Sequence, residues 1–157
     1  MKRQIATIGY EGTTIDAFIE TLQRASITVL IDVREVALSR KKGFSKNQLA
    51  SALAESGIEY VHLRGLGDPK EGREAARAGN MRQFQRIFAR HMKSDWAQAE
   101  LALAAKLVKA SRACLMCFEA DPSECHRSIV AHHLSDMTGL TVTALRAETA
   151  ARTLIAA

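Results

Sequence analysis

Residues 27–34 read ITVLIDVR, and this stretch decides the fold class. Apart from Thr28, every residue before Asp32 is aliphatic, and most are β-branched. A run without polar alternation is typical of a strand that is buried on both faces, as in a parallel sheet covered by helices. We therefore predict a central parallel strand here, with its carboxyl end at Asp32.

The rest of the chain alternates between strand and helix patterns around this run. Strands are expected at 4–10, 58–63, 112–118 and 140–145, and helices at 13–26, 44–57, 81–110 (broken near Ser94) and 121–138. Residues 64–80 are glycine-rich and are expected to form a loop. The pattern predicts a single three-layer α/β domain over 1–157, with a mainly parallel five-stranded sheet and helices on both faces. We expect the strand order 3-2-1-4-5, with a ligand site where the direction reverses.

Composition sets limits on the class of protein. The 157 residues are 47% hydrophobic and 25% charged, with a net charge of +5. This mild basicity permits an anionic partner without requiring one. No apolar stretch approaches the ~20 residues of a membrane span, no signal peptide is recognisable, and three cysteines are too few for a disulfide framework. We expect a cytoplasmic protein with no membrane contact.

Polar residues cluster just past the predicted strand ends, where a parallel sheet would bring them to one rim. Loop glycines among them would let a ligand approach the backbone closely. These residues are Gly9, Tyr10, Glu11 and Gly12 after the first strand, Asp32, Arg34, Ser39 and Arg40 after the second, and Glu119, Asp121, Cys125, His126 and Arg127 after the fourth.

The segment ADPSECHR, residues 120–127, has the features of a helix start. Asp121 is a suitable N-cap and Pro122 a suitable first helical residue, which would place Cys125, His126 and Arg127 in the second turn. Arg127 could then reach back toward the free N–H groups and favour a bound phosphate or carboxylate. Arg34 and Arg40 could add two-pronged contacts to the same anion.

Each of these residues also has a structural interpretation, and both stay open. Cys125 is either a small core residue or a thiol activated by the helix terminus. His126 is either a catalytic residue or a helix residue bonded to a backbone carbonyl, and His62 at a strand end is a possible proton carrier. Arg127 could pair with Glu119 or Asp121, and Asp32 with Arg34 could form a structural ion pair.

Metal and cofactor sites have little support in the sequence. Cys114 and Cys117 have C-x-x-C spacing, but positions three apart in a strand point to opposite faces. A zinc site of Cys117, Cys125 and His126 lacks a convincing fourth ligand. No Walker loop or dinucleotide fingerprint occurs, so we expect no metal and no cofactor.

Four blocks together resemble the bacterial and archaeal family called domain of unknown function 488. They are TIGYEG, IDVREVALSRKKGFSK, IEYVHLRGLGDPK and CFEADPSECHRSIVAHHL, which fall in order over residues 5–134. The resemblance implies a compact α/β domain with these motifs in one pocket, and no settled activity. It adds Gly67, Pro69, Lys70 and Cys117 to the motif positions. Ala37 replaces a proline that is usual in this family, and the last strand lacks a histidine that relatives often carry.

Three functional hypotheses follow. In the first, a small enzyme acts on a phosphate-bearing substrate, a nucleotide or nucleic acid, held by Arg34, Arg40 and Arg127 with Glu11, Asp32 or Glu119 as acid or base. Gly9, Tyr10, Gly12, Ser39 and Lys70 would complete the anion site. In the second, the same rim binds nucleotide or nucleic acid without reacting. In the third, Cys125 is a nucleophile or redox thiol.

Overall fold

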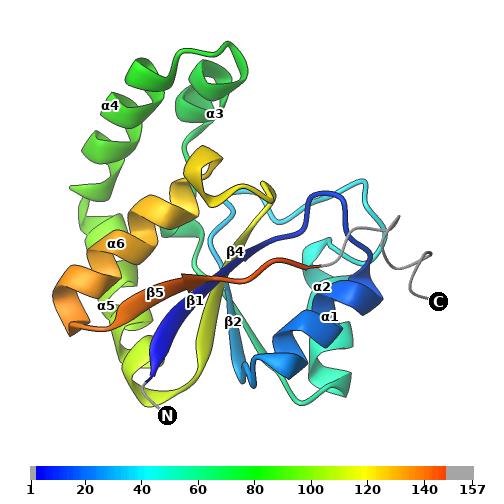
Figure 1. The fold of residues 1–157 in the computed structure, drawn as a ribbon. Helices are drawn as coiled ribbons and strands as arrows, with labels where there is room; N and C mark the ends of the chain where they lie inside the picture. The colour runs from blue at the N-terminus through cyan, green and yellow to red at the C-terminus, as the bar shows by residue number, and fades with distance from the viewer. Residues whose placement is uncertain (1–2, 148–157) are drawn as a thin grey trace.

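The computed structural model describes residues 3–147 and has the predicted three-layer α/β architecture (Figure 1). Its five strands are β1 (Gln4–Gly9), β2 (Val29–Asp32), β3 (Glu59–His62), β4 (Ala113–Cys117) and β5 (Thr141–Ala144). Its α-helices are α1 (Ile15–Arg24), α2 (Lys46–Glu55), α3 (Lys70–Arg77), α4 (Met81–Met92), α5 (Asp95–Ala110) and α6 (His126–Thr138). All strand pairs are parallel. The predicted fold class is therefore confirmed.

Two separate cores cover the two faces of the sheet. Alternate residues of β1 illustrate the division, since Ile5 belongs to the core that includes residues of α4, α5 and α6, whereas Ala6 belongs to the core that includes residues of α1 and α2. Cys114 and Cys117 divide in the same way, because Cys114 lies in the α1–α2 core and Cys117 in the other. The prediction that these two thiols point to opposite faces is confirmed.

The strand order is β3-β2-β4-β1-β5, so the predicted order was wrong in the place of β4. β4 lies between β2 and β1, with Leu115 paired to Thr7 on one side and Ile31 on the other. All five residues of β4 are buried, which a central position with a strand on either edge satisfies. The connection through α3, α4 and α5 is long enough to carry the chain back past β2.

The predicted loop at 64–80 contains a 3₁₀ turn, Arg64–Leu66, and helix α3. Gly72 in the middle of α3 argued against a helix, since glycine destabilises helix interiors. The structure gives the reason for this glycine. A Cβ at position 72 would lie 2.0 Å from Oδ1 of Asp68, so the close approach of the Asp68 carboxyl leaves no room for a side chain.

The predicted helix at 121–138 begins later than expected. Residues Pro122–Glu124 form a 3₁₀ turn capped by Asp121, and α6 starts at His126 with Cys125 as its N-cap. His126 and Arg127 therefore lie in the first turn of α6 and not in the second. Among residues 3–147, no helix combines the length and apolar character that crossing a bilayer requires.

Gly9 is the point where the ends of β1 and β4 touch. A Cβ on Gly9 would lie 1.8 Å from the carbonyl oxygen of Glu119. We predict that Gly9→Ala lowers the free energy of unfolding by about 2–4 kcal/mol, because backbone must move to admit the methyl group. Urea denaturation measures the change.

Gly79→Ala is the matched control for this substitution. Gly79 has φ 78° but no atom within 4 Å of the added Cβ, so it should cost only about 1 kcal/mol of left-handed strain. Equal losses for the two variants would contradict the steric account of Gly9.

Candidate functional site

A cavity of about 930 Å³ opens at the carboxyl ends of the central strands. Strand-end loops form one part of its wall, and α3 with the start of α4, at the top of Figure 1, forms another. Five of the residues predicted for the site line it: Tyr10, Arg34, Glu119, Cys125 and His126. Cys117, Phe118 and Ser123 line the same cavity. The loops after β1, β2 and β4 therefore converge as the strand-end argument predicted.

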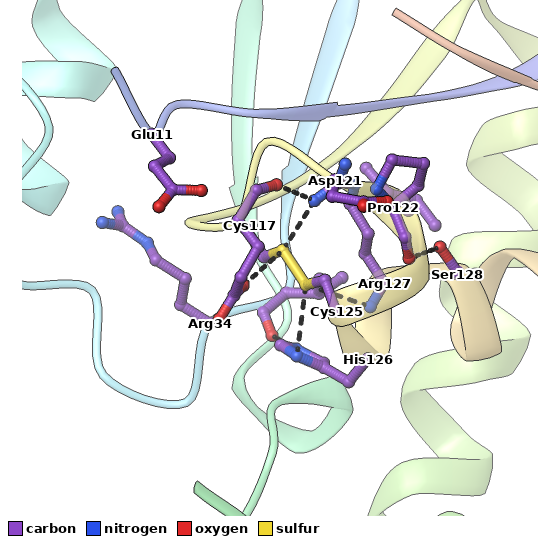
Figure 2. The surroundings of a disulfide bond; sticks show 12 residues. Glu11, Arg34, Cys117, Asp121, Pro122, Cys125, His126, Arg127 and Ser128 are labelled. Carbon is purple, nitrogen blue, oxygen red and sulfur yellow. Dashed lines mark hydrogen bonds between the residues drawn. A yellow bond between two sulfur atoms is a disulfide. The ribbon is translucent and has the colours of Figure 1, made fainter. Parts of the chain in front are cut away.

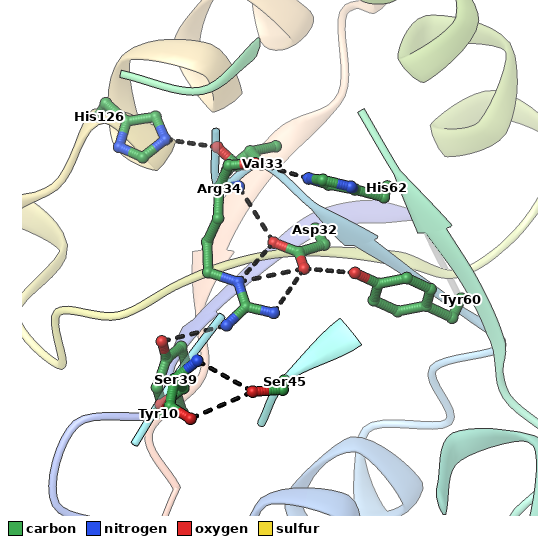
Figure 3. Close-up of polar contacts among 9 residues, drawn as sticks. All are labelled: Tyr10, Asp32, Val33, Arg34, Ser39, Ser45, Tyr60, His62 and His126. Atoms are coloured by element: carbon green, nitrogen blue, oxygen red, sulfur yellow. Dashed lines mark hydrogen bonds and ion pairs between the residues drawn. The ribbon is translucent and has the colours of Figure 1, made fainter. Parts of the chain in front are cut away.

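Arg34 is held rigidly at the cavity wall (Figure 3). Its Nε and Nη2 donate to both carboxylate oxygens of the fully buried Asp32 at 2.7–3.1 Å, and Nη1 donates to the Tyr10 hydroxyl at 3.2 Å. Tyr60 donates to the same carboxylate at 2.5 Å, and the imidazole of His62 donates to the Arg34 carbonyl at 2.7 Å. Burial alone would lower the pKa of Arg34, but the hydrogen bonds and charge of Asp32 raise it overall.

Asp32 and Arg34 thus form the buried ion pair that the sequence left open. Asp32 does not line the cavity, and both of its oxygens are engaged by neighbouring donors. This carboxylate orients the guanidinium. Its predicted role as an acid or base stays a prediction that the geometry does not favour.

Cys117 and Cys125 are joined by a disulfide at the cavity wall (Figure 2). Cys117 ends β4 and Cys125 caps α6, with its sulfur 3.5 Å from the backbone N–H of Arg127. His126 places Nδ1 3.7 Å from the Cys125 sulfur and donates from Nε2 to the Val33 carbonyl at 2.7 Å. Burial lowers the pKa of His126 to about 4, so the imidazole is neutral at pH 7. Once the disulfide is reduced, these two cysteines and this histidine form a group that could hold a metal ion.

The pairing of Cys117 with Cys125 was not predicted, although both residues had been noted. The sequence signal that could have predicted this pairing is the separation of eight residues between a cysteine at a strand end and a cysteine at a helix start. The loop and the 3₁₀ turn between β4 and α6 return the chain beside the end of β4, which brings the two sulfurs together. Cys125 is buried in the core and also lines the cavity, which agrees with its interpretation as a small core residue. Because its sulfur is bonded to Cys117 here, the interpretation as an activated thiol stays a prediction.

Arg127 lies behind the cavity wall and does not line it. The side chain is fully buried, and its terminal nitrogens donate to the carbonyl oxygens of Glu119 and Ala120 and, at 3.0 Å, to the sulfur of Cys117. Burial lowers the pKa of Arg127, with the nearby charge of Glu119 opposing this effect. The geometry gives Arg127 a structural role, in contrast to the anion contact expected from the sequence.

The other predicted residues lie near the rim but outside the cavity lining: Gly9, Glu11, Gly12, Ser39, Arg40 and Lys70. Glu11 accepts the backbone N–H of Ala120 at 3.1 Å, which ties the first loop to the loop after β4. Ser39 bonds to Ser45 across its own turn. Arg40 and Lys70 are exposed to solvent. Their proposed ligand contacts remain predictions.

Asp68, Arg73 and Arg77 are cavity residues that sequence reasoning missed. They lie in and after the GLGDPK motif, in the segment taken for a loop. Arg73 forms an ion pair with Glu35 at 3.1 Å and donates to the Asp68 carbonyl at 2.8 Å. Oδ1 of Asp68 is buried and has no hydrogen-bond partner among residues 3–147. Burial, with the charges of Glu119 and Glu35, raises the pKa of Asp68 to about 7 despite Arg73.

The raised pKa of Asp68 predicts a pH-dependent stability. From its ordinary pKa of 3.8 to about 7, the folded state retains a proton that the unfolded state loses, so stability falls as pH rises through this window. Asp68→Asn should remove this slope, leaving stability near pH 4 little changed and raising it near pH 8 by about 1–3 kcal/mol. Urea unfolding across pH measures both values.

Asp136→Asn is the matched control, since this carboxyl is exposed and should shift stability by less than about 0.5 kcal/mol at any pH. An Asp68→Asn protein that follows the wild-type pH profile would show that Asp68 titrates normally.

Comparison with known proteins identifies the family. Residues 14–134 match the family described as Domain of unknown function DUF488. No curated protein and no solved structure matched. The matched segment contains the cysteines, the histidine and the arginines of the cavity, and it confirms the resemblance that the four motif blocks carried. The chain belongs to the DUF488 family.

Proposed function

We propose that this protein is a small enzyme that acts on a phosphate-bearing small molecule of the nucleotide class, bound in the 930 Å³ cavity. The observation that carries the proposal is the orientation of Arg34. Arg34 is only 6% exposed, and its guanidinium is fixed by Asp32 and Tyr10 at the cavity wall. A planar fork fixed before binding loses little entropy when it grips a phosphate.

Arg34 retains donors for a ligand. Three of its five N–H groups are directed to Asp32 and Tyr10, which leaves one on each terminal nitrogen without a partner among the described residues. Arg77 is exposed on α3 at the cavity wall and forms no ion pair within residues 3–147. Arg34 and Arg77 therefore take the anion-binding role first assigned to Arg34, Arg40 and Arg127.

Aromatic side chains support a nucleotide in preference to a bare phosphate ester. Phe118 is 44% exposed, lines the cavity and packs in a T-shaped arrangement with Tyr10, with ring centroids 5.3 Å apart. Phe84 lines the cavity from α4. An exposed ring beside a fixed guanidinium offers a stacking surface for a base and a clamp for its phosphate.

Asp68 supports catalysis over passive binding. A carboxyl with its pKa near 7 can donate or accept a proton at neutral pH, which an ordinary aspartate cannot do efficiently. Asp68 lines the cavity together with Glu119, so two carboxyl groups in different environments face the proposed ligand. Such a pair suits separate acid and base roles.

Binding of nucleoside monophosphates, pyrophosphate and inorganic phosphate, measured by calorimetry, tests the proposal. We expect at least one nucleotide to bind wild type, and Arg34→Lys to weaken it about 10-fold, because lysine keeps the charge beside Asp32 but loses the fork. Arg77→Ala should weaken it several-fold. Arg40→Ala, which removes an exposed arginine outside the cavity, should change affinity less than about 2-fold.

Equal affinity in wild type, Arg34→Lys and Arg77→Ala would overturn the proposal. Binding that falls steeply with salt and is restricted to single-stranded oligonucleotides, without product on long incubation, would favour a nucleic-acid-binding module instead.

A further inference from the structure

Two cysteines, joined in a disulfide, and a histidine meet at one point of the cavity wall. Cys117 comes from the end of β4, Cys125 from the residue before α6, and His126 from the first residue of α6. Their ligand atoms all lie within 4.8 Å of one another, and all three residues line the cavity (Figure 2). Two elements that are fixed in the core therefore deliver three metal-ligand side chains to one place.

The backbone spacing of the two cysteines suits a metal better than a direct bond. Their Cα atoms are 7.3 Å apart, beyond the range of about 4.4–6.8 Å that disulfides normally span. A tetrahedral ion with metal–sulfur bonds of about 2.3 Å holds its sulfurs roughly 3.8 Å apart. The reduced cysteines can therefore reach a shared ion without the approach of the two backbones that a relaxed disulfide demands.

The surroundings prepare each side chain for coordination. The Val33 carbonyl can only accept, so Nε2 of His126 carries the proton and Nδ1 offers its lone pair on the side of Cys125. The guanidinium of Arg127 donates to the Cys117 sulfur at 3.0 Å, and the Arg127 backbone N–H points to the Cys125 sulfur at 3.5 Å. N–H donors and a fixed positive charge favour the thiolate forms that bind metals.

The donor set selects the kind of metal. Two thiolates and one imidazole match zinc and similar transition-metal ions, and they do not suit magnesium or calcium, which take oxygen ligands. Structural zinc sites use four protein ligands, whereas catalytic sites use three and keep one position open. Here three ligands lie on a cavity wall, with the Glu119 carboxylate 3.4 Å from the Cys117 sulfur.

We propose that the reduced protein binds one zinc-class ion through Cys117, Cys125 and His126, with the fourth coordination position open to the cavity. This site stands on its own ligand geometry and goes beyond the nucleotide proposal. A protein that binds zinc here and no nucleotide would refute only the earlier proposal, and the reverse result would refute only this one. An ion with an open position would supply Lewis-acid chemistry at the place where Asp68 and Glu119 also face the cavity.

The test uses the full chain, stripped with a chelator and reduced with a phosphine under argon. The phosphine takes oxygen from water to become its oxide, and the disulfide takes up two electrons and two protons to become two thiols. Cobalt(II) and zinc(II) are then titrated in. We expect one equivalent to bind, intense visible bands of tetrahedral cobalt, and a near-ultraviolet thiolate-to-cobalt absorption that zinc abolishes.

Variants locate the ion. Cys125→Ala and His126→Gln should each weaken zinc binding at least 10-fold, while Cys114→Ala, which removes the remaining thiol on the opposite face, should leave stoichiometry and spectrum unchanged. Circular dichroism checks that each variant is folded. If a variant is not folded, the cobalt spectrum of the wild type still tests the proposal. Absence of the sulfur-to-cobalt band in reduced wild type, or equal zinc affinity in Cys125→Ala, would overturn the proposal and leave a disulfide as the only role of this pair.

Discussion

The loop between β4 and α6 is organised around one buried cation, Arg127. A guanidinium removed from water is costly unless its donors are satisfied, and here backbone carbonyls and a sulfur accept from both terminal nitrogens, while Nε has no partner among residues 3–147. The carbonyls belong to Glu119 and Ala120, so the loop must curl around the side chain to reach it. The same Glu119 carbonyl occupies the space that Gly9 leaves free. Arg127 thus fixes the first loop, the loop after β4 and the sulfur of Cys117 together.

The two buried arginines, Arg34 and Arg127, have their charges compensated in different ways, and this difference sets the electrostatics of the cavity. Arg34 is paired with a buried carboxylate, so its charge is largely cancelled and its contribution to a ligand is directional. The hydrogen bonds of Arg127 that the structure defines go to neutral oxygens and to sulfur, so it retains a positive field beside the two cysteines. Arg34 therefore offers directional hydrogen bonds to a ligand, and Arg127 stabilises negative charge on the sulfurs of the cavity wall.

The sequence predicted the elements better than their arrangement. Buried runs such as 29–32 and the helix break near Ser94 are local signals, and the structure places these elements where the patterns indicated. Helix α3 was not predicted because Gly72 argued against a helix. The glycine is needed only because the Asp68 carboxyl packs against position 72, a contact that is made in the folded chain. Asp68 was missed for the same reason, since its raised pKa depends on burial under α3 and on Glu35 and Glu119. The strand-end argument found five cavity residues because it needs only parallel strands, whatever their order.

The order of the strands determines what the cavity can do. In the order first expected, β1 would separate β2 from β4 and hold the Cys-His segment at least one strand spacing, about 4.8 Å, further from Val33. With β4 between them, Val33 donates its N–H to the Met116 carbonyl and accepts from His126, so the residue that directly follows β2 both continues the pairing with β4 and orients the imidazole. The disulfide at the end of β4 then lies next to the loops that follow β2 and β1, and Figure 2 shows Arg34 and Glu11 from these two loops on the same side of it. An anion held by Arg34 would therefore lie beside the sulfurs of Cys117 and Cys125, because the central position of β4 makes the proposed anion site and the proposed metal site neighbours.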